Sequence, residues 1–206
     1  MAMPQTLLSR APDKTAPTLT AMGRFSLRLG RLHEVCGTSR RTFALWIATQ
    51  GTGPILWVTP EWEVSQLHGN GVLPWINPGR LIFVRPKRAE DILWTMEETL
   101  RSGAVALVVG DVPGLPGLTA VRRMHLAAET GAQIGIHAPL GLLLTPGGGG
   151  AQGVESRWHM APHHGTGQSA WHLERRRART APPQKWSVTQ GNTDVKNTQT
   201  LDIKEL

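Results

Sequence analysis

The sequence predicts an α/β fold, in which a mostly parallel sheet is flanked by helices and followed by a short β extension. Short, continuous apolar runs such as residues 54–59 are typical of strands buried on both faces. Longer segments with helical periodicity alternate with these runs along the chain. Strands that alternate with helices of this length imply a parallel sheet with right-handed crossovers.

The helix over residues 89–102 carries the clearest pattern. Its first turn contains Glu90 and Asp91, which suit the positive end of the helix dipole. Leu93, Met96 and Leu100 form one apolar stripe at helical spacing. Glycine at position 103 is a typical stop signal.

The other elements are predicted in chain order from the same signals. Core strands are expected over residues 29–35, 54–59, 81–85, 104–109, 134–137 and 140–145. Further helices are expected over residues 42–49 and 118–130, the second ended by Gly131. Short edge strands are expected over residues 157–160, 171–174 and 185–188.

These elements imply one main domain with appendages. We expect a flexible N-terminal segment over residues 1–23, an α/β core over 24–145, a glycine-rich flexible joint over 146–153, a basic β extension over 154–188 and a disordered tail over 189–206. The last six residues of the tail, LDIKEL, could form a docking segment.

The charge is positive and unevenly distributed. The formal net charge is +7, made of +5 over residues 1–50, −1 over 51–150 and +3 over 151–206. This pattern suggests contact with a polyanion, nucleic acid rather than membrane, although plain solubility would also suit it. The single Cys36 excludes a disulfide framework and fits a reducing compartment. We find neither a signal peptide nor an apolar run of membrane-spanning length, so a soluble cytoplasmic protein is expected.

The first core strand runs into a glycine turn and a helix, as in a P-loop protein. A working loop, G-x-x-x-x-G-K-[ST], needs a second glycine and a lysine, and this chain has neither. The corresponding residues form a degenerate nucleotide or anion site: Gly37, Ser39, Arg40, Arg41 and Thr42. Three readings stay open, namely a tight turn with solvated arginines, residual anion binding by helix amides and guanidinium groups, and ATP hydrolysis.

The second nucleotide-site signal is also incomplete. A Walker B strand ends in an Asp that holds Mg²⁺, but Gly110 stands at that position. Asp111 comes one residue later, and because strand side chains alternate faces we expect it to point the other way unless a bulge intervenes. Glu61 lies where a water-activating carboxylate could sit, but a surface position in a turn is the simpler interpretation.

A basic segment near the C-terminus is the best nucleic-acid candidate. Arginines grip phosphates with planar forks, and tryptophans stack on unpaired bases. The candidate nucleic-acid-binding residues are Arg175, Arg176, Arg177, Arg179, Trp171 and Trp186. The alternative is an exposed edge strand protected by charge.

The remaining aromatic and histidine residues give weaker signals. Trp46, Trp57 and Trp94 have core spacing, whereas Trp62 and Trp75 lie in loops and could belong to a partner-binding patch. The histidines at 159, 163 and 164 lack nearby cysteines and carboxylates, so no metal site is predicted. No catalytic residue is predicted either, because the serines have no nucleophile elbow.

Several of these motifs together resemble a known family. The matching segments are GRLHEVCG (30–37), PILWV (54–58), AEDILWTMEETLRSG (89–103), LTAVRRMHLAAE (118–129), ESRW (155–158) and WHLER (171–175). The first resembles the core strand of RecA running into its P-loop. Their order and spacing over residues 24–188 resemble the ImuA proteins, RecA-like proteins of bacterial mutagenesis operons.

The resemblance implies a RecA-like core without recombinase activity. ImuA-like proteins act in damage-induced mutagenesis (the SOS response), a branch of DNA repair. Their partners are a Y-family-like polymerase subunit, ImuB, and an error-prone replicative-type DNA polymerase, in a translesion complex that also engages the sliding clamp. The expected protein is thus a non-catalytic, cytoplasmic and nucleoid-associated scaffold that binds single-stranded DNA and needs no cofactor.

Two other functions remain open at this stage. One is a DNA-dependent ATPase of the RecA type, in which Arg40 or Arg41 replaces the lysine and ATP with Mg²⁺ is the cofactor. The other is a regulator of cell division or repair that binds only protein.

Overall fold

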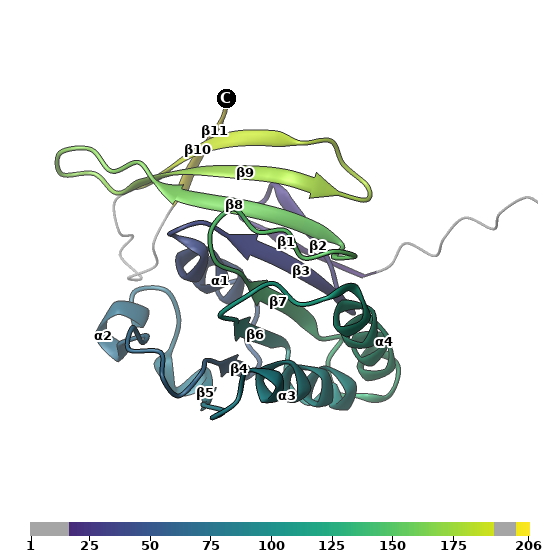
Figure 1. The fold of residues 1–206 in the computed structure, drawn as a ribbon. Coiled ribbons are helices and arrows are strands. Elements are labelled where there is room, and N and C mark those ends of the chain that lie inside the picture. Colours follow the sequence, from purple (N-terminus) through teal and green to yellow (C-terminus); the bar gives the residue numbers. More distant parts are fainter. Residues whose placement is uncertain (1–16, 192–200) are drawn as a thin grey trace, which may run out of the picture.

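A computed structural model describes residues 17–191 and 201–206. Its main feature is a nine-stranded mixed sheet with the order β11-β10-β9-β8-β3-β7-β6-β4-β5 (Figure 1). A separate two-stranded sheet pairs β1 (Thr18–Ala21) with β2 (Phe25–Arg28). The α/β class is therefore confirmed, and the sheet is mixed: five of its eight strand pairings are parallel, and the three antiparallel ones join the C-terminal strands.

The sheet has a parallel part and an antiparallel part. The parallel part contains β3 (Arg31–Cys36), β4 (Ile55–Val58), β5 (Leu81–Val84), β6 (Leu107–Asp111) and β7 (Leu140–Leu144). The strand β8 (Ser156–Pro162) pairs in parallel with β3 and antiparallel with the next strand. The antiparallel part continues through β9 (Ala170–Ala178), β10 (Gln184–Gln190) and β11 (Leu201–Glu205).

Helices cover both faces of the parallel part (Figure 1). On one face lies α1 (Arg40–Ala48), and the other is covered by α3 (Ala89–Ser102) and α4 (Leu118–Ile134). The connection from β4 to β5 contains the short helix α2 (Gly69–Val72) and the 3₁₀ turn η1 (Pro78–Arg80). These short elements stand where a full crossover helix is usual in such folds.

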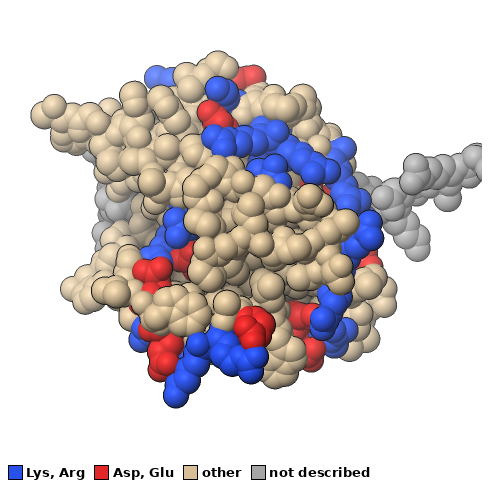
Figure 2. Space-filling view, viewed as in Figure 1, with Lys and Arg blue, Asp and Glu red and all other residues tan. Residues whose placement is uncertain are grey.

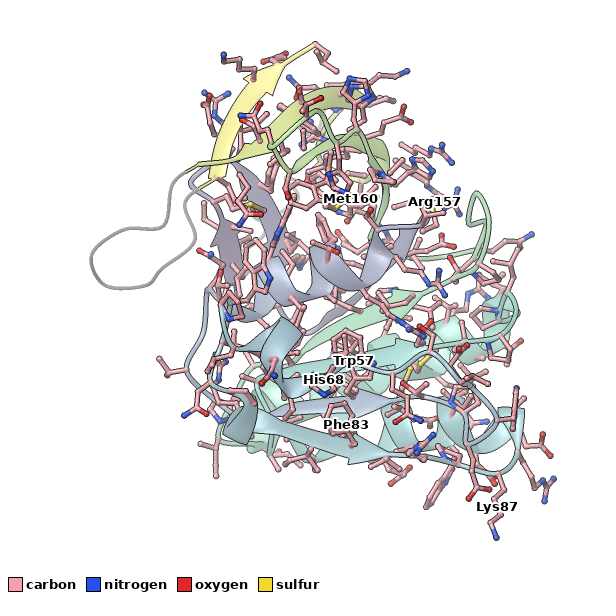
Figure 3. All side chains as sticks on the ribbon, turned by 90° about the vertical axis from the view of Figure 1, so that its left-hand side faces the viewer. Trp57, His68, Phe83, Lys87, Arg157 and Met160 are labelled. Carbon is pink, nitrogen blue, oxygen red and sulfur yellow. The ribbon has the colours of Figure 1, made fainter. Side chains whose placement is uncertain are left out.

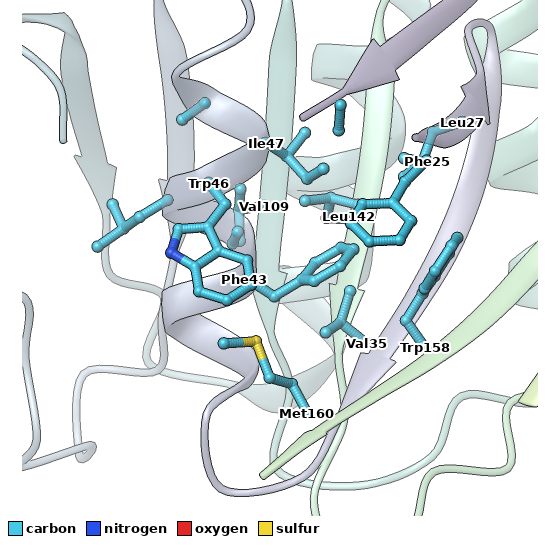
Figure 4. Close-up of a cluster of buried hydrophobic side chains, with 14 of the residues drawn as sticks. Phe25, Leu27, Val35, Phe43, Trp46, Ile47, Val109, Leu142, Trp158 and Met160 are labelled. Carbon is cyan, nitrogen blue, oxygen red and sulfur yellow. The ribbon is translucent and has the colours of Figure 1, made fainter. Parts of the chain in front are cut away.

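The core on the α1 side extends beyond the parallel strands. Phe43 and Trp46 of α1 pack with Trp158 of β8 and Phe25 of β2 in one buried cluster (Figure 4). The rings of Phe25 and Trp158 meet edge to face with centroids 5.5 Å apart. This cluster holds the β1–β2 hairpin and the C-terminal strands against the same face as α1.

Most predicted elements are present with small shifts in their bounds. The helix predicted over residues 89–102 is confirmed at both ends, and Gly103 closes it with φ +58°. Predicted edge strands are longer than expected and extend the main sheet, because β8 pairs with β3. The predicted core and the predicted extension therefore share one sheet. The hairpin β1–β2 was not predicted and begins inside the N-terminal segment that we expected to be flexible; residues 1–16 lie outside the described chain.

The strand predicted over residues 134–137 is wrong. Helix α4 continues through Gly131 to Ile134, and Ile134 and Ile136 are largely exposed. Gly131 is a packing residue rather than a helix stop: a Cβ there would lie 2.0 Å from the carbonyl oxygen of Leu100 on α3. The sequence signal was ambiguous because a helix terminus and a close helix–helix contact both favour glycine.

The core prediction for tryptophan holds in two of three cases. Trp46 and Trp57 are buried, as predicted, but Trp94 is 61% exposed on the outer surface of α3. Its neighbours Leu93 and Met96 carry the packing on the inner side of that helix. Among the described helices, none has the length and apolar character needed to cross a membrane.

Candidate functional site

The turn between β3 and α1 is closed by hydrogen bonds within the protein. The backbone N–H of Gly37 donates to the carbonyl oxygen of Gly147 at 3.1 Å, and that of Ser39 donates to Met160 at 3.1 Å. The N–H of Arg40 donates to the carbonyl of Gly37 at 3.3 Å. A phosphate loop works by pointing such N–H groups at phosphate oxygens. Here three of them are already occupied.

Strand β8 also fills the space in front of this turn. Gly37 has φ +90°, and a Cβ on it would lie 2.3 Å from the carbonyl oxygen of Met160 and 3.0 Å from the ring of His159. Figure 3 labels Met160 on the same strand as Arg157. The sequence Cys36-Gly37-Thr38 therefore makes a tight turn against β8, and a loop that goes round a triphosphate has no room here.

Arg40 and Arg41 at the start of α1 both pair with Asp111. Arg41 donates from Nε to Oδ2 of Asp111 at 2.5 Å, and Arg40 donates from Nη2 to Oδ1 at 3.2 Å. The Asp111 side chain is 4% exposed, whereas the two arginine side chains are 24% and 20% exposed. A second contact of Arg41 runs from Nη1 to Oγ of Ser65 at 2.8 Å. An internal carboxylate thus takes the place that an anionic ligand would need.

The expected orientation of Asp111 is wrong. Strand β6 begins at Leu107 and includes Asp111, which shares its face with Val109 on the α1 side. Gly110 faces the opposite side, where a Cβ would lie 2.0 Å from Sδ of Met96. The sequence prediction placed residue 110 on the side of the β3–α1 turn. In the structure residue 111 is on that side, because successive side chains of a strand point to opposite faces. No bulge between β6 and its neighbours is needed.

The remaining predicted residues of this site have structural contacts. Ser39 is buried at the N-cap position of α1 without a side-chain hydrogen bond to the helix, and Thr42 is half-buried in the first turn. Glu61 is exposed in the turn after β4, as the simpler interpretation predicted. The arrangement can hold α1 on the sheet edge, and its two guanidinium groups face two carboxylates, because Arg41 Nη2 also lies 3.9 Å from Oε2 of Glu63.

A cavity of about 270 Å³ lies next to Arg41. Trp57 and Phe83 form one wall, and because they are register partners on β4 and β5 their side chains share a face (Figure 3). Thr59 and Arg85 complete the part nearest the strand ends. Pockets at the carboxyl ends of parallel strands are common ligand sites in α/β folds, although this one is small.

Sequence reasoning missed the role of Glu34. Its buried carboxylate accepts hydrogen bonds from Thr145 Oγ1 at 2.8 Å, from the N–H groups of Gly150 and Ala151 at 2.8 and 3.0 Å, and from Arg157 Nε. The glycine-rich segment that we expected to act as a flexible joint is therefore anchored to β3 through these bonds. A carboxylate in the middle of a core strand was the available signal, since buried charges need partners.

The arginine run on β9 splits between two faces of the sheet. Arg175 lies over the rings of Trp158 and Trp186, with its Cζ atom 5.7 and 5.3 Å from their centroids. Arg176 faces the other side, where it donates to Glu174 and to the carbonyl of Gly148. Because side chains alternate along a strand, the run cannot present all its charges to one ligand.

Three of the predicted arginines stay exposed, namely Arg176, Arg177 and Arg179. Figure 2 shows Lys and Arg side chains in a band over the upper right of this view, where β9 ends in Figure 1. Arg179 is 60% exposed while it pairs with the buried Glu155 at 3.5 Å. Lys185 on the neighbouring strand is 65% exposed while it pairs with Glu174 at 3.3 Å. We call these four residues the basic band, in which Arg176 and Lys185 lie on one face of the sheet and Arg177 lies on the other.

The two tryptophans predicted beside this run are not on the surface. Trp171 is 6% exposed and Trp186 is 4% exposed, and both belong to the core on the α1 side. Their rings are thus covered and are not available for stacking on bases in this fold. The arginines next to these tryptophans in the sequence suggested that the rings are exposed. Because side chains alternate between the two faces of a strand, the rings instead point into the core.

The two predicted partner-binding tryptophans have different surroundings. Trp62 is 51% exposed in the loop after β4. Trp75 is half-buried, and its ring centroid is 6.3 Å from that of Trp46. Trp75 also lines a cavity of about 270 Å³ beside α1.

The titratable groups with large shifts are buried inside the fold. Burial lowers the pKa of His33 to about 4, and its ring bonds to Ser156 Oγ at 2.6 Å and to the carbonyl of Arg28 at 2.9 Å. Burial raises the pKa of Cys36 to about 11, so the thiol is a poor nucleophile. In the part of the chain that the structure describes, no three His, Cys, Asp or Glu side chains gather as a metal site would need.

Comparison with known proteins does not assign the chain to a family. No protein-family model matches the chain, and no curated protein is similar enough to count as a match.

Proposed function

We propose that the chain is a non-catalytic accessory protein with a RecA-like core, which binds single-stranded DNA and a polymerase-like partner during damage-induced translesion synthesis. The sheet order and the helices on both faces are compatible with a RecA-like core. The family resemblance of the sequence motifs supplies the setting, including the ImuB-like subunit and the error-prone polymerase as partners.

The observation that carries the non-catalytic part is the closed turn before α1. Its N–H groups bond to Gly147 and Met160, and its two arginines pair with Asp111, while Arg41 also lies 3.9 Å from Glu63. Phosphoryl transfer depends on positioning and on neutralising the phosphate charge. The N–H groups that would position a phosphate and the guanidinium groups that would balance its charge already bond to other parts of the protein, so we expect no hydrolysis of ATP.

The basic band supports the DNA-binding part. Its four exposed side chains carry four positive charges against two carboxylates, those of Glu174 and Glu155, on a chain whose formal net charge is +7. Phosphate contacts of this kind give affinity that falls steeply with salt and carries little sequence preference. The alternative role, protection of a strand edge, is weaker here because β9 lies between β8 and β10 inside the sheet.

The test replaces Arg176, Arg177 and Arg179 together by alanine. Affinity for a labelled single-stranded oligonucleotide should fall at least tenfold at low salt, and the salt slope should become shallower. The matched control is Arg122→Ala with Lys87→Ala and Lys204→Ala, which removes three exposed charges outside the band. Equal affinity for the triple variant and the wild-type chain would contradict the proposed DNA contact.

One observation favours a second function, the DNA-dependent ATPase. Asp111 faces the start of α1, where a Mg²⁺-holding carboxylate of an ATPase would lie. This reading requires Mg²⁺-dependent hydrolysis that is lost in Asp111→Ala. A phosphate-release assay with and without DNA separates the two functions.

A further inference from the structure

The cavity beside Arg41 lies at the carboxyl ends of β4 and β5, on the α1 side of the sheet. Its wall repeats one pattern on both strands, an aromatic residue followed two places later by a polar one. Trp57 and Thr59 stand at the end of β4, and Phe83 and Arg85 stand at the end of β5. Because side chains two residues apart on a strand share a face, the four groups line one cavity.

The inner part of this wall is aromatic. Trp57 is 2% exposed and belongs to the core on the α1 side, whereas Phe83 is 51% exposed on the edge strand β5 (Figure 3). The two residues are register partners on neighbouring parallel strands. Leu67, from the loop between β4 and α2, adds an aliphatic surface to the cavity. Aromatic side chains favour contact with a planar ring, and such a ring would cover the exposed part of Phe83.

The outer part of the wall carries an unmatched positive charge. The guanidinium group of Arg85 donates to the backbone carbonyl of Glu61 at 3.4 Å. It also donates to the side-chain oxygen of Gln66 at 3.2 Å when that amide is oriented by its hydrogen bonds. Both acceptors are neutral, and no carboxylate among the described residues forms an ion pair with Arg85. The guanidinium is thus held in place with its charge unbalanced.

The other polar groups at the cavity differ in their bonding. Arg41 pairs with Asp111 at 2.5 Å and lies 3.9 Å from Glu63, so its charge is matched within the fold. Thr59 is 7% exposed, and its hydroxyl has no hydrogen-bond partner among the described residues. A hydroxyl at a cavity wall can donate to or accept from a ligand placed there. Arg85 and Thr59 are therefore the polar groups left for a ligand.

We propose that this cavity binds a small planar aromatic carboxylate. Its ring packs on Trp57 and Phe83, and its carboxylate accepts hydrogen bonds from the guanidinium of Arg85 and the hydroxyl of Thr59. Aromatic walls select a planar ring, and a guanidinium fork selects a carboxylate. Drug-sized ligands occupy about 300 to 1,000 Å³. A cavity of about 270 Å³ therefore suits a compound of one or two rings and is too small for a nucleoside triphosphate.

This proposal goes beyond the accessory function and does not depend on it. None of the four residues of the basic band lines the cavity. A base of single-stranded DNA is the alternative occupant, because bases also stack on aromatic side chains. The small carboxylate fits better, since the cavity offers one unmatched cation and not a groove of cations that follows a phosphate backbone.

The first test is calorimetry on the full chain with three compounds. Naphthoate has the ring and the carboxylate, naphthamide has the same ring without the charge, and octanoate has the charge without the ring. We expect naphthoate to bind at one site per chain with a Kd below about 1 mM. Naphthamide and octanoate should each bind at least tenfold more weakly, because each lacks one of the two contacts.

The second test uses two variants of the cavity wall. Arg85→Gln removes the charge but keeps hydrogen-bonding groups, so it should weaken naphthoate binding at least tenfold and leave naphthamide binding unchanged. Phe83→Ala should weaken the binding of both ring compounds at least fivefold. Both side chains are exposed, and Tm values check that the variants fold.

Two matched controls lie next to these positions on the chain. Lys87→Gln removes an exposed charge two residues beyond Arg85, outside the cavity wall. Ile82→Ala removes a side chain that is 47% exposed on the opposite face of β5 from Phe83. Neither change should alter the affinity for naphthoate.

Several results would overturn the proposal. These are the absence of naphthoate binding at millimolar concentration, equal affinity for naphthoate and naphthamide, or unchanged naphthoate affinity in Arg85→Gln. A saturating single-stranded oligonucleotide should leave naphthoate binding intact. If the oligonucleotide displaces naphthoate, and Phe83→Ala weakens DNA binding as well, the cavity holds a base of the DNA and the assignment to a small carboxylate is wrong.

Discussion

Asp111 at the end of β6 and Arg41 at the start of α1 form a charged hydrogen bond of 2.5 Å across the carboxyl edge of the sheet. Arg40 joins the same carboxylate from the preceding position. The pair links the first helix to a strand that lies two places from β3, the strand before that helix, in the sheet order. The contact with Asp111 fixes the start of α1. It also pairs the two guanidinium groups with a carboxylate of the protein, where an anionic ligand would otherwise bind.

Asp111→Asn should therefore weaken the fold and open the anion site together. We expect the free energy of unfolding to fall by about 2 kcal/mol, because two partly buried guanidinium groups lose their carboxylate. Phosphate should then stabilise the variant more than the wild-type chain. Urea unfolding with and without phosphate measures both effects.

The control for this prediction is Asp202→Asn, which removes one charge from an exposed side chain. It should change the unfolding free energy by less than about 0.5 kcal/mol. An Asp111→Asn variant as stable as the wild-type chain and indifferent to phosphate would show that the pair has no structural role.

His33 should make the fold sensitive to acid. Its pKa is about 4 in the fold because of burial, against an ordinary value of 6.5. As the pH falls below 6.5, His33 becomes protonated in the unfolded chain but stays neutral in the folded chain. The contribution of His33 to the free energy of unfolding is therefore complete above pH 6.5 and is lost as the pH falls towards 4. Between pH 7.5 and 5 this group alone should remove about 2 kcal/mol.

His33→Gln should flatten this part of the pH profile, even though it is less stable at pH 7.5. The control is His163→Gln, whose ring is exposed. Unfolding free energies at the two pH values give the comparison. A wild-type slope that persists in His33→Gln would assign the acid sensitivity to other groups, such as His125, whose pKa burial also lowers.

Gly149 should be intolerant of any side chain. It has φ +74°, and a Cβ would lie 2.9 Å from both Sγ of Cys36 and Oε1 of Glu34. Gly149→Ala should cost about 3 kcal/mol from backbone strain and overpacking together. Gly147→Ala is the matched control, because it has φ +59° with no atom within 4 Å, and should cost about 1 kcal/mol. Equal Tm values for the two variants would mean that the loop does not close on Glu34.

Two positions on one helix test the burial pattern of α3. Met96→Asp should destabilise the fold by about 4 kcal/mol or more, because it places a charge in the core beside Gly110. Trp94→Asp, two residues earlier, should change stability by less than about 1 kcal/mol because that side chain is 61% exposed. Thermal unfolding of the two variants measures the difference. A larger loss of stability in Trp94→Asp than in Met96→Asp would mean that the helix presents its other face to the sheet.

The sequence predicted the elements with strong local signals and missed those that depend on tertiary pairing. Helix α3 was correct at both ends because dipole-matched acids, an apolar stripe and a terminal glycine agree. The end of α4 was wrong because Gly131 serves a close contact with Leu100 that no local pattern encodes. The joining of the C-terminal strands to β3 was missed for the same reason, since it is a non-local pairing.

The candidate site shows the same division. The missing lysine and second glycine of the phosphate loop could be read directly from residues 37–42. The orientation of Asp111 could not, because it depends on where β6 begins, and a shift of the strand start changes which residue faces α1. Trp171 and Trp186 were predicted at the surface by their basic neighbours, whereas the alternation along the strands buries them.

We have proposed that this chain binds single-stranded DNA without hydrolysing ATP. The most direct measurement follows DNA affinity and Mg²⁺-dependent phosphate release in one sample of the purified chain at two salt concentrations. We expect DNA binding that falls steeply with salt and no phosphate release above a no-protein blank. Hydrolysis that DNA stimulates and that Asp111→Ala removes would show that the chain is an ATPase.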